Sequence, residues 1–135
     1  MQILIIRVNK ERNDGKGKIE MELNKYLPLT ETTHYILLSL LEPAHGYIMM
    51  QKVEKLSNQT VKIAAGTMYG AIENLLKQKL IKAVKSTDKR RKTYVITEKG
   101  IEVLRRDCER MKHITQITEK LLPITMSENG GMEDV

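Results

Sequence analysis

Apolar residues recur at steps of three or four along much of the chain, which is the spacing of one face of an α-helix. Residues 30–41 are so rich in apolar side chains that we expect a largely buried helix there, capped by Thr30 and ended before Pro43. The same spacing predicts an amphipathic helix over residues 46–57. These patterns predict two successive helices joined by a short turn.

A third helix is expected over residues 65–79, and its two sides differ in character. Its apolar side is formed by Met68, Ile72, Leu75, Leu76 and Leu80. The opposite side is small or polar with little charge, and it is formed by Thr67, Gly70, Ala71, Asn74 and Gln78. An ordinary exposed face usually carries more Lys and Glu, whereas a small, neutral, hydrogen-bonding face suits a helix that enters a DNA groove. Both interpretations stay open at this point.

Residues 81–85 and 92–96 are rich in Ile, Val, Thr and Tyr, and they predict two strands with the polar turn 86–91 between them. Thr97 can cap a long helix that Pro123 ends. We therefore expect a mainly α fold with a small β-hairpin. Helices, hairpin and long last helix in this order form a winged helix-turn-helix followed by a C-terminal dimerisation helix.

This order of elements divides the chain into segments. Residues 1–28 are expected to be an N-terminal extension, residues 29–97 a winged helix-turn-helix DNA-binding domain, and residues 98–123 the dimerisation helix. Residues 124–135 are polar and contain glycine, so we expect a disordered tail. One hypothesis for the extension is that translation starts within it, at Met21.

The positive charge of the chain is concentrated in one place. The 135 residues contain 23 Lys and Arg and 17 Asp and Glu, which gives a net charge of +6. Residues 81–100 contain seven basic and two acidic residues, so this stretch alone carries +5. A basic patch on a nearly neutral body favours contact with a polyanion, although the charge alone is equally compatible with a solvated loop.

Composition and spacing argue against several other classes of protein. The single cysteine excludes an internal disulfide and a Cys-based zinc site, and it suits a reducing cytoplasm. No apolar run approaches the ~18 residues of a membrane span. We find no nucleophile with a base nearby and no metal-site spacing of His and Cys, so we expect no enzyme activity, no cofactor and no metal.

Three blocks of sequence stand out within the expected elements. They are His45-Gly46-Tyr47, then Gly66-Thr67-Met68-Tyr69, then Arg90-Arg91-Lys92-Thr93-Tyr94-Val95-Ile96-Thr97-Glu98-Lys99-Gly100. In this order they resemble the PadR family of bacterial transcriptional regulators over about residues 29–122. The resemblance implies a cytoplasmic homodimer that binds an inverted-repeat operator in double-stranded DNA and usually represses transcription. It also implies a small-molecule effector, because branches of the family respond to phenolic acids or other small molecules.

The pattern and the resemblance together give the candidate DNA contacts. They are Thr67, Tyr69, Gly70, Ala71, Asn74, Lys85, Lys89, Arg90, Arg91 and Lys92. Tyr69 matches a hallmark position of the family, and we expect its hydroxyl, with that of Thr67, to donate to a phosphate while its ring covers the edge of the core. We expect Gly46 to let Tyr47 pack inward and Gly100 to let the last helix approach the hairpin closely.

The expected last helix carries a long apolar stripe. It is formed by Ile101, Leu104, Cys108, Met111, Ile114, Ile117 and Leu121. Such a stripe is longer than a small domain can cover, so we expect these residues to form the interface of a homodimer. The alternative is a helix folded back on its own domain. We expect Cys108 to be a buried structural thiol. Because no aromatic residue lies on this helix, a flat aromatic effector stacked across the interface is disfavoured.

The chain departs from the family at Ala64 and Ala65, where a capping Ser or Asn is common. Either the third helix begins without a side-chain cap or Thr67 supplies one. Two other functions stay open. A winged-helix module that pairs with another protein and never touches DNA would show the same pattern. An RNA-binding protein is disfavoured because the chain has no Phe or Trp on which bases could stack.

Overall fold

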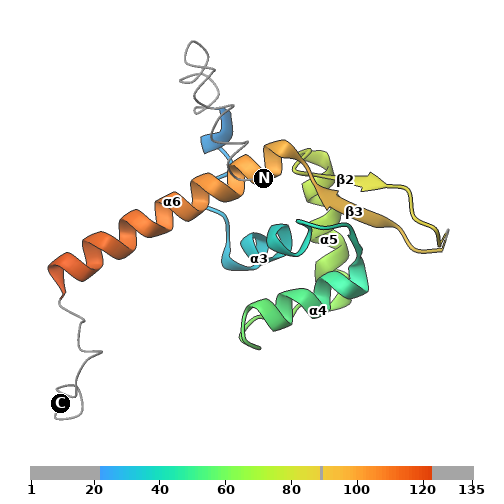
Figure 1. Ribbon diagram of the computed structural model, residues 1–135, viewed down its shortest axis with the longest axis horizontal. Coiled ribbons are helices and arrows are strands. Elements are labelled where there is room, and N and C mark those ends of the chain that lie inside the picture. The colour runs from blue at the N-terminus through green and yellow to red at the C-terminus, as the bar shows by residue number, and fades with distance from the viewer. Residues whose placement is uncertain (1–21, 89, 123–135) are drawn as a thin grey trace.

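The computed structural model describes residues 22–88 and 90–122. Its elements are α3 (Glu31–Ser39), β1 (Ala44–His45), α4 (Gly46–Leu56), α5 (Ala65–Lys77), β2 (Ile81–Val84), β3 (Thr93–Ile96) and α6 (Glu98–Leu121) (Figure 1). The mainly α fold with a β-hairpin is confirmed, and the expected helices and strands begin and end within a few residues of the observed ones. Three parts of the chain lie outside the described residues: residues 1–21, Lys89, and residues 123–135, which include the expected tail 124–135.

A strand that the sequence pattern did not predict completes a three-stranded sheet. β1 pairs antiparallel with β3, and Ala44 lies opposite Tyr94 while His45 lies opposite Thr93. β3 also pairs antiparallel with β2 as the expected hairpin, so the strand order is β1-β3-β2. The short strand β1 thereby fixes the start of α4 beside the hairpin.

The helices and the sheet enclose one apolar core. Its most deeply buried side chains are Ile36, Leu37, Leu40, Met49, Val53, Met68, Leu80, Ile81 and Val103. Each large side chain buried in this way stabilises the fold by about 1.5–3 kcal/mol. Leu23 belongs to the same cluster, and Tyr26 and Leu27 pack against it. The part of the expected N-terminal extension that is described, residues 22–28, is therefore packed on the domain.

The turn between α4 and α5 is made by residues in the left-handed region of the backbone. Asn58 has φ of 59° and Gln59 has φ of 70°. The Ser57 hydroxyl accepts a hydrogen bond of 2.9 Å from the backbone N–H of Val61 and so ties the end of α4 to the residues after the turn. Val61 and Ile63 then bury their side chains without forming a regular element.

Threonine caps begin the first and last helices of the domain, as the sequence predicts. Oγ1 of Thr30 accepts a hydrogen bond of 3.0 Å from the N–H of Thr33. Oγ1 of Thr97 accepts one of 3.0 Å from the N–H of Gly100. A cap of this kind stabilises a helix by about 1 kcal/mol, so both helix starts are specified locally.

Gly100 allows α6 to lie directly on the end of α5 and the start of β2. A Cβ atom at this position would meet the backbone carbonyl oxygen of Leu80 and would lie 2.7 Å from Cγ1 of Ile96. No side chain fits there unless the backbone shifts, so the expected close approach of the last helix is confirmed. Thr97 adds a hydrogen bond of 2.8 Å from its hydroxyl to the carbonyl of Lys79.

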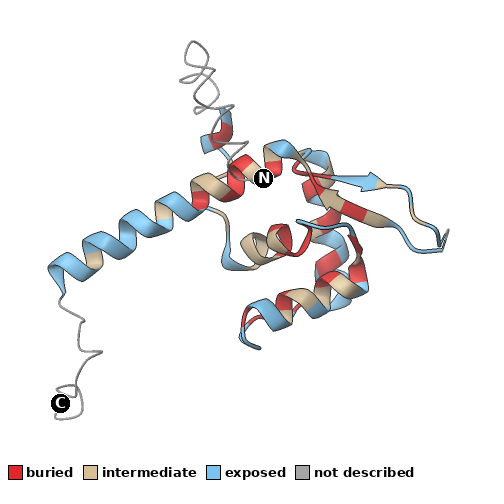
Figure 2. Cartoon of the chain, in the orientation of Figure 1, coloured by how far each residue is buried: buried red, intermediate tan, exposed pale blue. Residues whose placement is uncertain are grey.

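Only the first half of α6 is covered by the domain. Its buried residues end at Asp107, and residues 108–121 contain none. Figure 1 shows α6 and the β2–β3 hairpin projecting from opposite sides of the helical body. Figure 2 shows that the projecting half of α6 is almost entirely exposed. The described chain therefore places an apolar stripe outside its own core.

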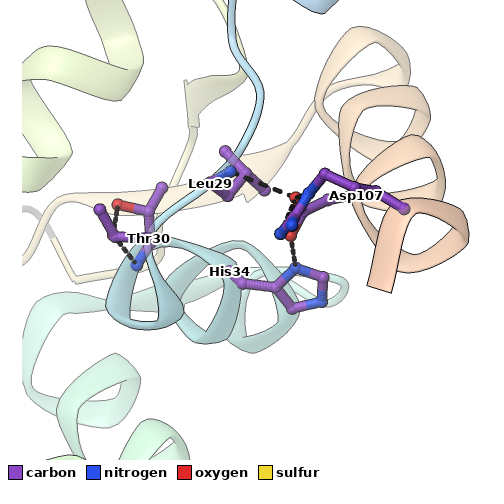
Figure 3. A network of polar contacts seen from close by, with 6 residues as sticks. Leu29, Thr30, His34 and Asp107 are labelled. Carbon is purple, nitrogen blue, oxygen red and sulfur yellow. Dashed lines mark hydrogen bonds and ion pairs between the residues drawn. The ribbon is translucent and has the colours of Figure 1, made fainter. Parts of the chain in front are cut away.

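A buried carboxylate joins α6 to α3 (Figure 3). Oδ2 of Asp107 lies 2.8 Å from Nδ1 of His34, and Oδ1 accepts hydrogen bonds from the backbone N–H of Leu29 at 3.2 Å and from Nε of Arg110 at 2.9 Å. Burial alone would raise the pKa of Asp107, but these hydrogen bonds outweigh it and hold the pKa below its ordinary value.

Candidate nucleic-acid interface

The side of α5 that faces away from the core is almost free of side chains over its first half. Met68, Ile72 and Leu75 are buried. With 3.6 residues per turn, the opposite line of the helix contains Gly66, Gly70, Glu73 and Lys77. A Cβ atom built on either of these glycines would meet nothing within 4 Å. Packing inside the protein therefore does not require glycine at either position.

The polar face that the sequence predicts on α5 lies beside this line. Thr67, Gly70 and Asn74 are exposed, whereas Ala71 is half-buried and packs against the core. Ala71 and Asn74 also border a small cavity of about 170 Å³ between α5 and the segment around Tyr26. The face is thus accessible along Thr67, Gly70 and Asn74 and is partly closed at Ala71.

The start of α5 has no side-chain cap. Ala64 occupies the N-cap position and makes no capping hydrogen bond, so Thr67 does not supply the cap. The first N–H groups of an α-helix have no partner within the helix. Uncapped N–H groups at a helix start suit a phosphate group, because the helix dipole is positive there.

Tyr69 and Thr67 point to different sides of α5, contrary to the expectation that their hydroxyls meet one phosphate. Thr67 and Tyr69 are two positions apart, which places them about 200° apart around the helix axis. Tyr69 lies on the wing side with 55 % of its surface exposed. Its ring rests on Gly46, where a Cβ atom would lie 3.0 Å from Cε1 of Tyr69. Gly46 therefore makes room for Tyr69 instead of orienting Tyr47.

Tyr47 does not pack inward as the sequence pattern suggested. Its side chain is 60 % exposed, and it borders a cleft of about 440 Å³. The residues that line this cleft are His45, Gly46, Tyr47, Tyr69, Arg90, Arg91, Lys92 and Tyr94. We call β2, β3 and the turn between them the wing. The cleft brings three cationic side chains of the wing beside the two exposed tyrosines.

The turn of the wing is organised by Asp88. The Ser86 hydroxyl accepts a hydrogen bond of 3.1 Å from the N–H of Asp88. Oδ1 of Asp88 accepts one of 2.9 Å from the N–H of Arg90, and its carbonyl oxygen accepts one of 3.1 Å from the N–H of Arg91. These bonds set the direction in which both arginines leave the backbone.

Arg91 is held from outside the wing as well. Nη1 of Arg91 lies 3.1 Å from Nε2 of His45, and Nε lies 3.8 Å from Oδ2 of Asp88. Tyr94 lines the same cleft and is buried. This burial, and to a smaller extent the nearby phenol of Tyr69, raises the pKa of the Tyr94 hydroxyl. Tyr94 is thus a neutral side chain that lines the cleft beside the cations of the wing.

Among the residues that the structure describes, the remaining predicted contacts and the predicted interface residues do not line the cleft. Lys85 is exposed but does not line the cleft, and Lys89 lies outside the described residues. On α6, Leu104 is buried in the core of its own domain and Ile101 packs against that core. Cys108 is exposed in the single chain, so its burial stays a prediction that depends on the proposed dimer interface. The other predicted interface residues are exposed: Met111, Ile114, Ile117 and Leu121.

Sequence reasoning missed three residues at this surface. His45 and Tyr47 were noted as part of a motif but were given no place at the interface. Glu73 was passed over although helical spacing places it on the exposed line of α5. Glu73 could have been found because it lies two positions before the apolar Leu75 and so about 200° away from it around the helix, whereas His45 reaches the site only through the pairing of β1 with β3.

A family model described as the transcriptional regulator PadR-like family matches residues 36–106. The chain belongs to the PadR-like family. The matched region of this PadR-like protein runs from α3 into the first half of α6 and includes the whole cleft. The resemblance drawn from the sequence blocks is therefore confirmed. A comparison with curated protein sequences finds no match.

Solved structures of other regulators are similar to this PadR-like chain. A transcriptional regulator from Clostridium thermocellum is 27 % identical, with a TM-score of 0.57 over 67 % of this chain and 89 % of that one. A PadR family regulator from Eggerthella lenta is 26 % identical, with a TM-score of 0.56 over 84 % and 96 %. A PadR-like regulator from Bacillus cereus shares the fold at 24 % identity, with a TM-score of 0.56 over 73 % and 96 %.

Two negative findings apply to residues 22–88 and 90–122. No helix in these ranges is long and apolar enough to cross a membrane. No three or more His, Cys, Asp or Glu side chains in the same ranges gather closely enough to hold a metal ion.

Proposed function

We propose that this PadR-like protein is a cytoplasmic, sequence-specific DNA-binding regulator. In this proposal it binds an inverted-repeat operator as a homodimer and represses transcription until a small-molecule effector releases it. The observation that carries the proposal is the cleft in which Arg90, Arg91 and Lys92 lie beside the exposed residues Tyr47 and Tyr69. Cations and phenol hydroxyls that converge on one cleft can bind a backbone phosphate.

The proposed division of labour follows from the two parts of the surface. The wing and the uncapped start of α5 carry positive charge or free N–H groups, so they supply affinity for any sequence. The exposed line and polar face of α5, from Thr67 to Asn74, supply sequence choice through hydrogen bonds to base edges in the major groove. Gly66 and Gly70 support this arrangement because they let the helix backbone approach the bases.

The homodimer is proposed from the projecting half of α6. Met111, Ile114, Ile117 and Leu121 form an exposed apolar row there, and such rows usually mark protein interfaces. A two-fold pair of α6 helices would present two α5 helices to successive major grooves, about 34 Å apart. Leu104 plays no direct part in this interface, because its own domain already covers it, and Ile101 is partly covered there as well.

Three measurements on the purified full chain test the proposal. Fluorescence anisotropy with a short labelled duplex of mixed sequence at low salt should show binding that weakens as salt rises. Sedimentation equilibrium should show a dimer. The fragment upstream of its own gene, examined by footprinting, should show a protected inverted repeat. A monomer that ignores duplex DNA at low salt would overturn the proposal and would favour a winged-helix module that binds another protein.

A further inference from the structure

One cation of the cleft is held by a residue from a different part of the chain. Arg91 lies in the turn of the wing, and its side chain is 61 % exposed. Nη1 of Arg91 nevertheless lies 3.1 Å from Nε2 of His45, which is 46 positions earlier in the sequence. Within the described part of the chain, this contact bridges the wing and the strand β1.

The chemistry of this contact fixes the state of the imidazole. A guanidinium group has five N–H donors and no acceptor. Nε2 of His45 must therefore accept the hydrogen bond through its lone pair, which leaves the ring proton on Nδ1 and the ring neutral. A protonated His45 would lose the acceptor and would place a second cation against Arg91, beside Arg90 and Lys92.

His45 is a firm anchor for a side chain that leaves a surface turn. Its backbone pairs with Thr93 of β3, and it occupies the N-cap position of α4. The residue after it, Gly46, is buried under the ring of Tyr69. The sheet and the helix start therefore fix His45, and a rigid acceptor can hold Arg91 in one orientation.

We propose that His45 is a positioning residue that orients Arg91 for a DNA backbone phosphate at the cleft. The inference rests on the proposed function. His45 faces Nη1, and Asp88 faces Nε at 3.8 Å. Neither contact uses Nη2, so its two N–H groups are left to bind a phosphate oxygen. A side chain that is already ordered loses less conformational freedom on binding.

The test is a double-mutant cycle in the full chain, read by anisotropy with a short labelled duplex of mixed sequence. His45→Leu should weaken binding about threefold to tenfold, the cost of ordering one long side chain. His45→Gln should restore binding to within about twofold of the parent, because its amide oxygen can accept in place of Nε2. Circular dichroism and melting curves show that each variant is folded.

Arg91→Ala and Arg90→Ala provide the matched backgrounds. The His45→Leu effect should vanish in the Arg91→Ala background and persist in the Arg90→Ala background. Nitrogen-15 NMR of the imidazole should show the proton on Nδ1. An equal effect of His45→Leu in both backgrounds, or a ring protonated on Nε2, would overturn the role of His45. If Arg91→Ala itself leaves binding unchanged, the wing contact of Arg91 in the proposed function fails, and the role of His45 fails with it.

Discussion

Asp107 of α6 and His34 of α3 are joined at 2.8 Å although 73 positions separate them in sequence. The Asp107 side chain is only 1 % exposed, and its other oxygen, Oδ1, accepts hydrogen bonds from the backbone N–H of Leu29 and from Nε of Arg110. A buried carboxylate is costly unless such partners surround it. The contact therefore fixes the position of α6 on the domain.

Replacing Asp107 with Asn should lower the free energy of unfolding by about 2 kcal/mol, because its hydrogen bonds lose the negative charge. Urea unfolding at one fixed protein concentration measures the change. Glu109→Gln is the control, since Glu109 pairs with Arg105 on the exposed side of α6, and a surface pair contributes about 1 kcal/mol or less. Equal losses in the two variants would contradict a structural role for Asp107.

Acid should weaken the fold through the same carboxylate. The folded pKa of Asp107 lies below its ordinary value, so the folded state favours the ionised form. The stability from this group is therefore complete above about pH 3.9, the ordinary pKa of Asp, and is lost as pH falls through the lower folded pKa. Unfolding curves at several pH values should show the difference between parent and Asp107→Asn shrinking in acid. A constant difference would refute the linkage.

Removing two wing cations should flatten the salt dependence of DNA binding. Arg90→Ala combined with Arg91→Ala should weaken binding to all sequences and reduce the slope of log K against log salt by about one to two units. Lys112→Ala combined with Lys120→Ala is the control, because both lysines are exposed on α6 and the charge change is the same. Anisotropy titrations measure both slopes, and an unchanged slope in the wing variant would exclude the phosphate contact.

Gly70→Ala should separate stability from binding. The new Cβ meets nothing within the protein, and alanine favours a helix over glycine by about 0.5–1 kcal/mol. The fold should therefore become more stable, whereas binding to an operator fragment should weaken because the methyl group holds α5 away from the bases. Thermal melting and anisotropy measure the two effects. Unchanged affinity in a stabilised variant would show that DNA does not approach Gly70.

Glu73→Gln should relax the choice of sequence. Glu73 is the first long side chain after Gly66 and Gly70 on the exposed line of α5, and a carboxylate there can accept from cytosine N4 while phosphates repel it. Discrimination at one base pair of each half-site should fall about tenfold, and binding to random duplex should rise. Selection from a randomised duplex library measures both. Glu119→Gln on α6 is the charge-matched control, and identical preferences in the two variants would contradict the prediction.

The helices could be predicted because their signals are local. Apolar spacing locates each helix, and Thr30 and Thr97 mark two helix starts by cap chemistry that depends on a few neighbouring residues. The hairpin follows in the same way from its β-branched and aromatic residues. The two-residue strand β1 carries no comparable signal, because it is defined by pairing with β3 about 50 positions later.

The directions of individual side chains at the site were harder to predict. Tyr47 and Tyr69 both have an apolar ring and a polar end, so their residue type alone fits an inward or an outward position. The ring of Tyr69 takes the space over Gly46, and Tyr47 is left exposed. The partners of His45 and His34 come from distant elements, so local pattern could not reveal either contact.

The attachment of α6 has a mechanical consequence. Gly100 lets the start of α6 contact the backbone of Leu80, between α5 and the wing. About two turns further along α6, Asp107 binds His34 of α3. Two contacts along one helix axis restrict rotation of α6 relative to the rest of the domain. A tilt imposed on the free end of α6 is consequently transmitted to α5 and the hairpin together, as the arm of a rigid lever.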